Sequence, residues 1–263
     1  NLNELPFIDR DLTNWKLYAF KIGNFKKTPG TYIMAGRDCW WGRCKFCSWP
    51  TLYPEFRSRS PENVIDEIET LIRKYNVKEI MDDTGTFPIG EWLNKFCQGM
   101  IERGFNKQIS IDCNMRFGAL APEDYVLMKK AGFRLILFGL ESANQDTLDR
   151  IDKNLTEEEI IKSCKMARSA GLYPHITIMF GYPWETYEQA GKTLELGQTA
   201  KYRKEDAVAL TNGEAGLNAF IANEGSAPAN RYKFDSINVF YKKDYGAVIQ
   251  MITAKKLDFF KTK

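Results

Sequence analysis

The chain has 263 residues, of which 44% are hydrophobic and 27% charged, and its formal net charge is +3. This composition is that of an ordinary globular protein with a substantial core, and the near-neutral charge gives no support for nucleic-acid binding. The sequence shows neither the roughly 20-residue apolar run of a membrane span nor a secretory signal, so we expect a cytoplasmic protein.

The predicted elements divide the chain into three parts. Residues 1–30 predict an N-terminal lead-in or linker, residues 31–200 a core domain, and residues 201–263 a C-terminal extension. In the core, apolar runs alternate with amphipathic stretches, as in repeated βα units. The predicted strands are 31–37, 77–82, 109–115, 134–140 and 174–180. The predicted helices are 61–75, 89–103, 121–131, 156–170 and 185–200.

Helix ends carry recognisable signals in the core. Ser60 is placed to cap the first helix, Pro61 occupies its first turn, and Gly104, Gly132 and Gly171 stand where helix C-terminal caps belong. The repeated units predict an α/β fold with a parallel sheet. In the extension, a strand is predicted at 237–241 and the Lys-rich tail is compatible with a helix. No pattern for a sixth βα unit is visible there, and the sequence assigns the extension no role.

Three cysteines, Cys39, Cys44 and Cys47, lie within nine residues and follow the first predicted strand. Structural zinc sites and electron-transfer [4Fe–4S] clusters normally have four protein ligands, so three thiolates would leave one iron open to a reactive ligand. The remaining cysteines and the single histidine, His175, are distant in sequence, which disfavours zinc. A non-catalytic Fe–S or zinc-binding domain stays as the alternative from another class.

The cysteine motif, the aromatic Phe46 before its last cysteine, and the pattern from residue 31 to 200 resemble the radical S-adenosylmethionine (SAM) enzymes. The usual spacing there is C-x3-C-x2-C. The extra residue in this chain lengthens the loop without removing a ligand. The resemblance is greatest to the subclass of cobalamin-dependent methylases and methylthiotransferase-like enzymes. It implies a partial (β/α) TIM-like barrel of five to six parallel strands with an irregular C-terminal extension.

The resemblance also implies an activity. Cys39, Cys44 and Cys47 would bind a [4Fe–4S] cluster whose open iron holds SAM, and reductive cleavage would yield a 5′-deoxyadenosyl radical that functionalises an unactivated C–H bond. Methyl transfer is the leading outcome; rearrangement, cyclisation or C–C bond formation without cobalamin is the alternative. The implied partners are a small-molecule, lipid or peptide substrate and an electron donor such as a flavodoxin or ferredoxin. Cobalamin is a further cofactor if a domain that binds it exists outside this segment.

Strand ends are the positions to search, because parallel α/β folds bind ligands at the carboxyl ends of their strands. By resemblance, Phe46 packs near the adenine of SAM, although it could equally shield a cluster from water. Asp82 or Asp83 would hold the SAM ammonium group, unless this segment is simply a turn that caps the next helix. Arg116 would reach the SAM carboxylate or ribose, unless it is an ordinary surface arginine. Strand parity places Asp112 and Asn114 on the same face as Arg116.

Two later strand ends complete the expected site. Glu141 and Ser142 resemble the segment that contacts the methionyl or ribose groups of SAM, with Gly139 allowing close approach of the cofactor. The backbone near Ile178 would border the adenine. In the following turn, Trp184 replaces a family glycine, and Glu185 with Thr186 is predicted to start the next helix. His175 lies at the start of its strand, where a structural role is favoured over proton transfer.

Overall fold

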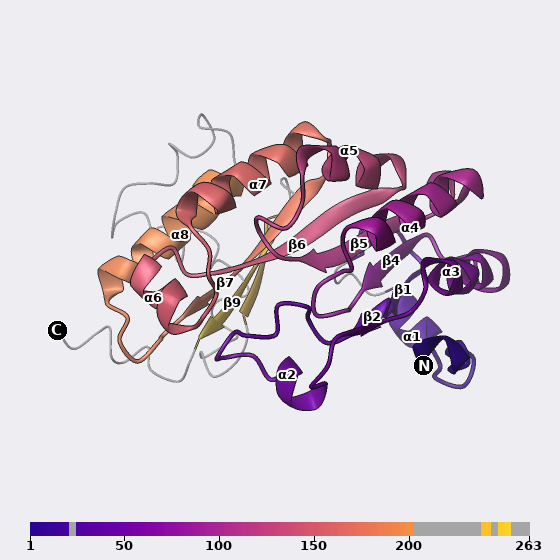
Figure 1. Ribbon diagram of the computed structural model, residues 1–263, viewed down its shortest axis with the longest axis horizontal. Helices are drawn as coiled ribbons and strands as arrows, with labels where there is room; N and C mark the ends of the chain where they lie inside the picture. Colours follow the sequence, from indigo (N-terminus) through magenta and orange to yellow (C-terminus); the bar gives the residue numbers. More distant parts are fainter. Residues whose placement is uncertain (21–24, 202–237, 243–246, 254–263) are drawn as a thin grey trace. The chain divides into compact units, whose positions relative to one another are not determined.

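The computed structural model describes residues 1–20, 25–201, 238–242 and 247–253 (Figure 1). They form an α/β fold with two compact units: Asn1–Leu137 with Met166–Tyr173, and Phe138–Lys165 with Pro174–Lys263. The strands are β1 (Gly30–Ile33), β2 (Gly36–Arg37), β3 (Arg57–Ser58), β4 (Glu79–Asp82), β5 (Ser110–Met115), β6 (Phe133–Glu141), β7 (Tyr173–Phe180), β8 (Asn238–Lys242) and β9 (Ala247–Thr253). The α-helices are α1 (Lys16–Ala19), α2 (Trp49–Leu52), α3 (Pro61–Tyr75), α4 (Glu91–Glu102), α5 (Pro122–Lys130), α6 (Gln145–Arg150), α7 (Glu157–Ser169) and α8 (Tyr187–Lys201), and two 3-10 helices are η1 (Leu2–Glu4) and η2 (Phe105–Lys107).

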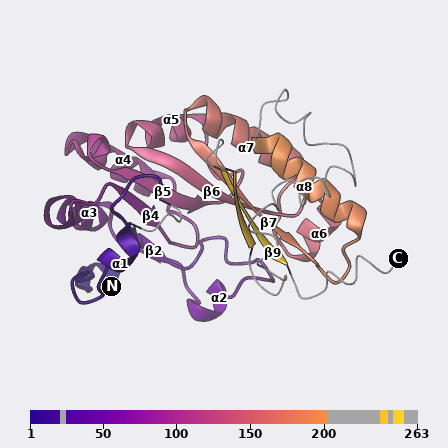
Figure 2. The same cartoon turned by 180° about the vertical axis from the view of Figure 1, so that it is seen from behind.

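The first unit is built on a sheet whose strands follow in the order β1-β4-β5-β6. Strands β1 and β4 are parallel, as are β4 and β5, so that Ile33, Asp82 and Cys113 lie in one row across the sheet. Helices α3, α4 and α5 pack one against the next (Figure 2). Because the strands are parallel, the loops that follow β1, β4 and β5 leave from the same edge of the sheet.

Helix α3 shows why the predicted elements form. Ser60 accepts a hydrogen bond from the backbone of Asn63, Pro61 occupies the first turn, and Asn76 ends the helix in the left-handed conformation with φ of 52°. Its apolar stripe, including Ile68 and Leu71, is fully buried. The predicted helix is confirmed, and the other elements predicted between 77 and 200 begin and end within two residues of their predicted positions.

The first predicted strand and one helix differ from expectation. The segment 31–37 is divided into β1 and β2, because the chain leaves the main sheet after Ile33 and pairs with β3 instead. Helix α6 has only six residues and was not predicted. A helix this short has too few turns to display an apolar periodicity.

In the second unit the strand order is β6-β7-β9-β8. The predicted C-terminal strand is confirmed as β8, which pairs antiparallel with β9. Strand β9 pairs parallel with β7, Ile178 opposite Met251, so the extension does contribute a parallel strand that the sequence pattern missed. The short apolar run of β9 does not distinguish a buried strand from a helix. In the Lys-rich tail, which by sequence is compatible with a helix, residues 247–253 form strand β9 instead, and residues 254–263 lie outside the described residues. Of the helices that the structure describes, none is long and apolar enough to cross a membrane.

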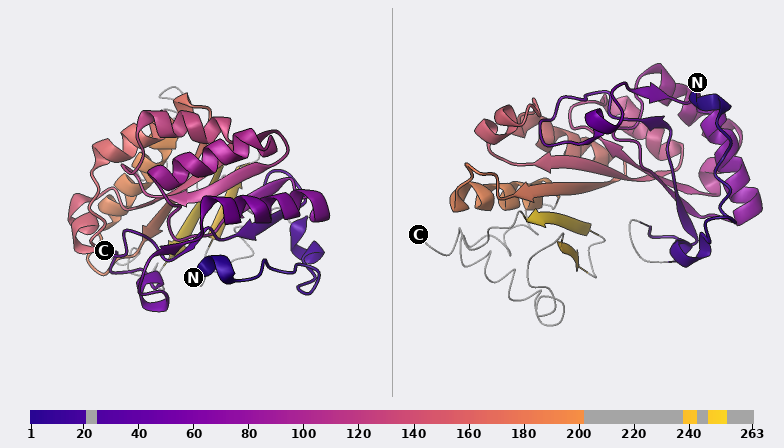
Figure 3. Two further views of the ribbon diagram at one scale, coloured as in Figure 1. Left: turned by 45° about the vertical axis from the view of Figure 1, so that its right-hand side comes forward. Right: turned by 90° about the horizontal axis from the view of Figure 1, so that it is seen from below.

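The N-terminal segment belongs to the first unit and lies along α3 (Figure 3). Asn3 accepts a hydrogen bond from the backbone of Ser60, and Arg10, only 3% exposed, reaches the carboxylate of Glu67. The predicted lead-in is therefore held against the core by specific polar contacts.

Candidate active site

The loop of residues 38–56, here called the Cys loop, carries the three clustered cysteines. Strands β2 and β3 pair at its base, and α2 lies within it (Figure 1). The thiols of Cys39, Cys44 and Cys47 are all partly exposed, and the Cys47 amide donates to the Cys44 carbonyl at 3.0 Å. Phe46, between the last two cysteines, is 39% exposed. The loop is thus closed at its base and presents its thiols and an aromatic ring near solvent.

Within the part of the chain that the structure describes, no three His, Cys, Asp or Glu side chains lie close enough to hold one metal ion. The donor chemistry nonetheless fits an iron–sulfur cluster, because three accessible cysteines share one loop and thiolates are the ligands such clusters use. In such a cluster each thiolate binds a different iron, so the three sulfurs need not meet at one point.

The turn after β4 packs closely against the start of the Cys loop. A Cβ atom on Gly85 would lie 3.0 Å from the Asp38 carbonyl oxygen and 3.2 Å from Cβ of Cys39, so a side chain there would push the first cysteine away. The Cys39 sulfur lies 2.8 Å from the Thr86 hydroxyl. Asp38 is 3% exposed with φ of 72°, and its Oδ1 has no hydrogen-bond partner among the described residues. These contacts link two strand ends and had no signal in the sequence.

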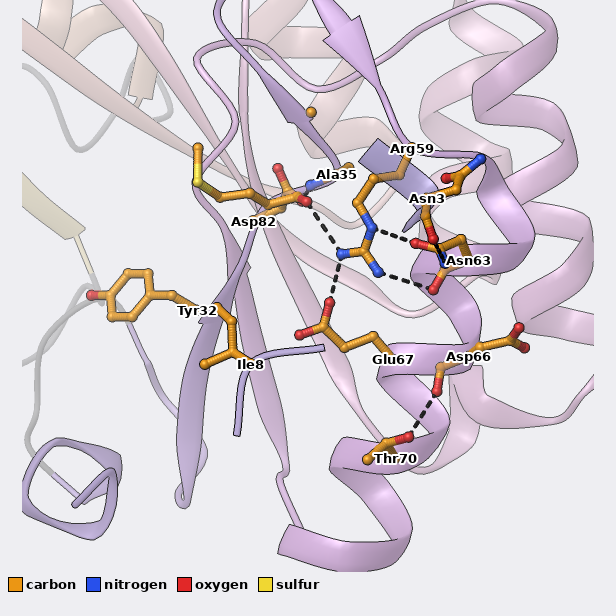
Figure 4. A network of polar contacts seen from close by, with 12 residues as sticks. Asn3, Ile8, Tyr32, Ala35, Arg59, Asn63, Asp66, Glu67, Thr70 and Asp82 are labelled. Atoms are coloured by element: carbon orange, nitrogen blue, oxygen red, sulfur yellow. Dashed lines mark hydrogen bonds and ion pairs between the residues drawn. The ribbon is translucent and has the colours of Figure 1, made fainter. Parts of the chain in front are cut away.

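A buried ion network holds the base of the Cys loop. Arg59, just after β3, donates to the Glu67 carboxylate at 2.5 Å and to the carbonyl oxygen of Met34, and its amide bonds to the Ala35 carbonyl (Figure 4). Arg10 binds the other oxygen of Glu67 at 3.2 Å. One carboxylate on α3 therefore ties both strands at the base of the loop to the N-terminal segment.

The adjacent carboxylates Asp82 and Asp83 have different surroundings. Asp82 is fully buried, and its two oxygens accept hydrogen bonds from the amides of Ala35, at 2.7 Å, and Thr84, at 3.0 Å. Asp83 is exposed, but desolvation still raises its pKa, partly offset by a hydrogen bond with Asn114. Asp82 therefore stabilises the turn after β4, which was the alternative to SAM binding for this segment. Asp83 is the carboxylate that is exposed to a ligand.

Asp82 should make the stability of the protein depend on pH. Burial raises its pKa from 3.8 to about 6. Since the folded-state pKa exceeds the unfolded value, its contribution is complete below about pH 4 and is lost as the pH rises through about 6, a change of about 3 kcal/mol. Urea denaturation of wild type and Asp82→Asn should show wild type losing this advantage between these pH values. A stability difference that does not change with pH would contradict the prediction.

Arg116 follows β5 and lies against the Cys loop. Its guanidinium carbon is 4.0 Å from the ring centroid of Trp41. The guanidinium carbon of Arg43 is 4.9 Å from the same centroid. Arg116 is half-buried, and the neighbouring Asn114 donates to the Thr84 carbonyl at 2.9 Å. The guanidinium group is planar and always charged, and its fork of N–H donors matches the geometry of a carboxylate. The Trp41 contact joins β5 to the Cys loop and was not predicted.

The third residue of the predicted polar face, Asp112, has its partners within the protein. It is fully buried, binds Arg134 and accepts a hydrogen bond from the Leu135 amide at 3.1 Å. Arg134 also binds Glu79 at 2.6 Å. Burial raises the pKa of Asp112 to about 9. Because the carboxyl group of Asp112 is paired within the protein, we interpret this cluster as structural, while Cys113, on the opposite parity, is buried as predicted.

In the second unit, β6 ends at Glu141, which is 8% exposed and has φ of 63°. Its Oε1 lies 3.0 Å from Nζ of Lys153. A Cβ on Gly139 would lie 2.3 Å from that same oxygen. The space above Gly139, expected to admit the cofactor, is therefore occupied by the carboxylate of Glu141.

Ser142 is fully buried in a polar network. Its hydroxyl oxygen accepts hydrogen bonds from the amide and the side chain of Asn144, at 3.1 and 3.2 Å, and lies 3.4 Å from the Thr193 hydroxyl. These bonds stabilise the turn that starts α6 and link it to α8. Of the predicted pair, Glu141 is thus the better placed to meet a ligand.

Strand β7 and its turn complete the predicted positions. Ile178 is 2% exposed and His175 is also buried, in agreement with a structural role for the histidine.

The turn after β7 leads into α8. Thr186 and Gln189 exchange hydrogen bonds at the start of α8, which confirms Thr186 at the helix start. Glu185 lies in the turn before the helix, where its carboxylate accepts a hydrogen bond from the Gly181 amide at 2.7 Å, and burial raises its pKa. Trp184 donates to the Thr147 hydroxyl at 3.0 Å and so fixes the turn to α6.

Two curated proteins give sequence matches over most of this chain. It is 29% identical over 204 residues to an uncharacterized methyltransferase of Pyrococcus horikoshii, covering 75% of this chain and 42% of that protein. It is 28% identical over 202 residues to the anaerobic magnesium-protoporphyrin IX monomethyl ester cyclase of Cereibacter sphaeroides, covering 74% of this chain and 32% of the cyclase. The chain therefore spans less than half the length of either relative.

Solved structures support the fold. The radical SAM methyltransferase TsrM of Kitasatospora setae superposes with a TM-score of 0.57 at 17% identity, covering 65% of this chain and 34% of TsrM. The cobalamin-dependent SAM radical enzyme OxsB gives 0.55 at 21% identity, covering 63% and 26%. The predicted α/β fold with a partial TIM-like barrel is confirmed.

The model of the Radical SAM superfamily matches residues 33–197, more than half of the chain. That range contains the Cys loop, Asp83, Arg116 and Glu141, all at the ends of sheet strands or in the loops that follow them. The chain belongs to the radical SAM superfamily and, with it, to the enzymes that use a [4Fe–4S] cluster and SAM.

Proposed function

We propose that this chain is the catalytic core of a radical SAM enzyme that transfers a methyl group to an unactivated carbon. The observation that carries the proposal is the 29% identity, over 204 residues, to a protein named as a methyltransferase. Several relatives at lower identity are named as methylthiotransferases, which favours the same class of group transfer. The substrate would be a small molecule, lipid or peptide.

Cys39, Cys44 and Cys47 would hold the cluster, since their thiols are partly exposed on one loop. When bound, the cluster and SAM supply one-electron reduction of a sulfonium and hydrogen-atom abstraction from a C–H bond. An external electron donor such as a flavodoxin or ferredoxin would supply the electron. The aromatic ring of Phe46 would cover the adenine or keep water from the cluster, and the backbone at Ile178 would border the adenine.

The other residues would orient SAM by charge and hydrogen bonding. Arg116, which lies over the ring of Trp41, would bind the carboxylate of SAM, and the exposed carboxylate of Asp83 would bind its ammonium group. Glu141 would accept a hydrogen bond from a hydroxyl or the ammonium group. We assign Asp82 and Ser142 to holding the turns beside these groups, because their oxygens already accept backbone hydrogen bonds.

The products of SAM distinguish methyl transfer from other radical reactions. Anaerobically reconstituted protein should be mixed with dithionite, methyl-deuterated SAM and fractionated host extract, with and without hydroxocobalamin. Methyl transfer predicts S-adenosylhomocysteine together with a product heavier by a deuterated methyl group, both detected by mass spectrometry. Formation of 5′-deoxyadenosine with neither of these products would reject the methyltransferase proposal.

A second candidate is radical cyclisation, favoured by the 28% identity to a magnesium-protoporphyrin ester cyclase. Cyclisation would consume SAM without transferring its methyl group. The same experiment would then yield 5′-deoxyadenosine and an unlabelled product that has lost hydrogen, with no S-adenosylhomocysteine.

A further inference from the structure

Lys153 and Glu141 form a buried ion pair in the second unit. The Lys153 ammonium lies 3.0 Å from Oε1 of Glu141, and the two residues are 9% and 8% exposed. A lysine is almost never buried to this degree without a partner, because desolvating its charge is costly. The pair is therefore a specific feature of this strand end, and nothing in the sequence pattern indicated it.

The backbone on both sides of the pair adopts the left-handed conformation. Glu141 has φ of 63°, and the residues that flank Lys153, Asp152 and Asn154, have φ of 54° and 48°. Asp and Asn adopt the left-handed region readily, whereas for Glu it is uncommon, and such backbone tends to occur at functional sites. The Lys153 amide is also bonded to the Leu148 carbonyl at 2.9 Å. The loop after α6 is thus shaped so that this lysine meets this carboxylate.

Gly139 provides the space in which the pair lies. A Cβ atom at this position would be 2.3 Å from Oε1 of Glu141 and 2.9 Å from Nζ of Lys153. Both distances are shorter than those that real Cβ atoms show, so a side chain at this position would displace the ends of Glu141 and Lys153 from the positions they occupy here.

The pair leaves one oxygen of Glu141 available. Oε1 is bound by Lys153, whereas Oε2 accepts no hydrogen bond from any residue that the structure describes. An ionised carboxylate can only accept hydrogen bonds, so a ligand at Oε2 must bring an O–H or N–H donor. SAM has such donors in its ribose hydroxyls and its ammonium group.

We propose that Lys153 is a positioning residue that fixes the carboxylate of Glu141 so that Oε2 accepts a hydrogen bond from a hydroxyl or ammonium group of SAM. The inference rests on the SAM-binding role proposed for Glu141. Lys153 acts through Glu141 and does not itself touch the cofactor, so its removal should matter only while Glu141 is present.

Binding of radiolabelled SAM to the cluster-loaded protein, measured by equilibrium dialysis without reductant, tests this inference without turnover. Glu141→Gln and Lys153→Met should each weaken binding about tenfold or more, because each disturbs a hydrogen bond to a charged group. The double variant should bind as weakly as the single variants and no more weakly, since the two residues act as one unit. Lys192→Met is the matched control, because Lys192 and Glu188 form an exposed ion pair 3.3 Å apart in the same unit.

Three outcomes would overturn the inference: unchanged affinity in Lys153→Met, additive losses in the double variant, or an equal loss in the Lys192→Met control. If Lys153→Met does not fold, the double variant replaces it, because it removes both buried charges. Its affinity should then equal that of Glu141→Gln, and a further loss would show that Lys153 contacts SAM directly. Failure of the proposed methyl transfer is distinguishable, since wild type would still bind SAM; a wild type that binds no SAM would overturn both.

Discussion

A Cys44→Ala variant is expected to form no 5′-deoxyadenosine above background, while its apoprotein keeps the thermal stability of wild type. Cys44 lies partly exposed on the Cys loop, so its side chain contributes little to the core. Its loss would leave two thiolates where a three-cysteine cluster is needed. The measurement is iron and sulfide content after anaerobic reconstitution, followed by mass spectrometric quantification of 5′-deoxyadenosine with dithionite and SAM.

Cys97→Ala is the matched control for the cysteine prediction. Cys97 is fully buried in α4, and burial raises the pKa of its thiol to about 12, so it is not a thiolate ligand at neutral pH. Its substitution should lower thermal stability modestly and leave cluster content and 5′-deoxyadenosine formation unchanged. The opposite pattern, a cluster retained in Cys44→Ala and lost in Cys97→Ala, would show that the wrong cysteines were assigned.

The fold of residues 31–200 could be predicted largely because its signals are local. Ser60, Pro61 and the glycines after the helices mark helix ends within a few residues, and the structure places those ends as expected. Strand β9 could not be predicted, because its short apolar run becomes a strand by pairing with β7, a partner about 70 residues earlier in the chain.

For the candidate site, too, local sequence signals predicted only part of the arrangement, and contacts between distant segments were not predicted. The cysteine spacing is a local pattern and identified the Cys loop, but the sequence could not choose between Asp82 and Asp83. That choice depends on where the amides of Ala35 and Thr84 lie in the fold. The stacking of Arg116 on Trp41 and the pairing of Lys153 with Glu141 likewise join segments whose proximity is set by the fold.

Glu67→Gln is expected to cause a large loss of global stability. The Glu67 carboxylate is 3% exposed and lies between the guanidinium groups of Arg10 and Arg59. Removing its charge leaves two buried cations uncompensated, which typically costs about 3–5 kcal/mol. For a chain of this size the melting temperature should fall by about 10 °C. Chemical denaturation and calorimetry of the apoprotein measure both quantities.

The same variant should loosen the Cys loop, because Arg59 connects Glu67 to the carbonyl groups of Met34 and Ala35 at the base of the loop. Limited proteolysis under conditions in which the protein stays folded should therefore cleave residues 38–56 faster in Glu67→Gln than in wild type. Glu91→Gln is the control, since Glu91 forms an exposed pair with Lys95, and water screens such a surface pair so that its loss should change stability little. Equal stability losses in the two variants would mean that the buried network is no stronger than a surface pair. Unchanged cleavage in Glu67→Gln would mean that the β2–β3 pairing alone holds the base of the loop.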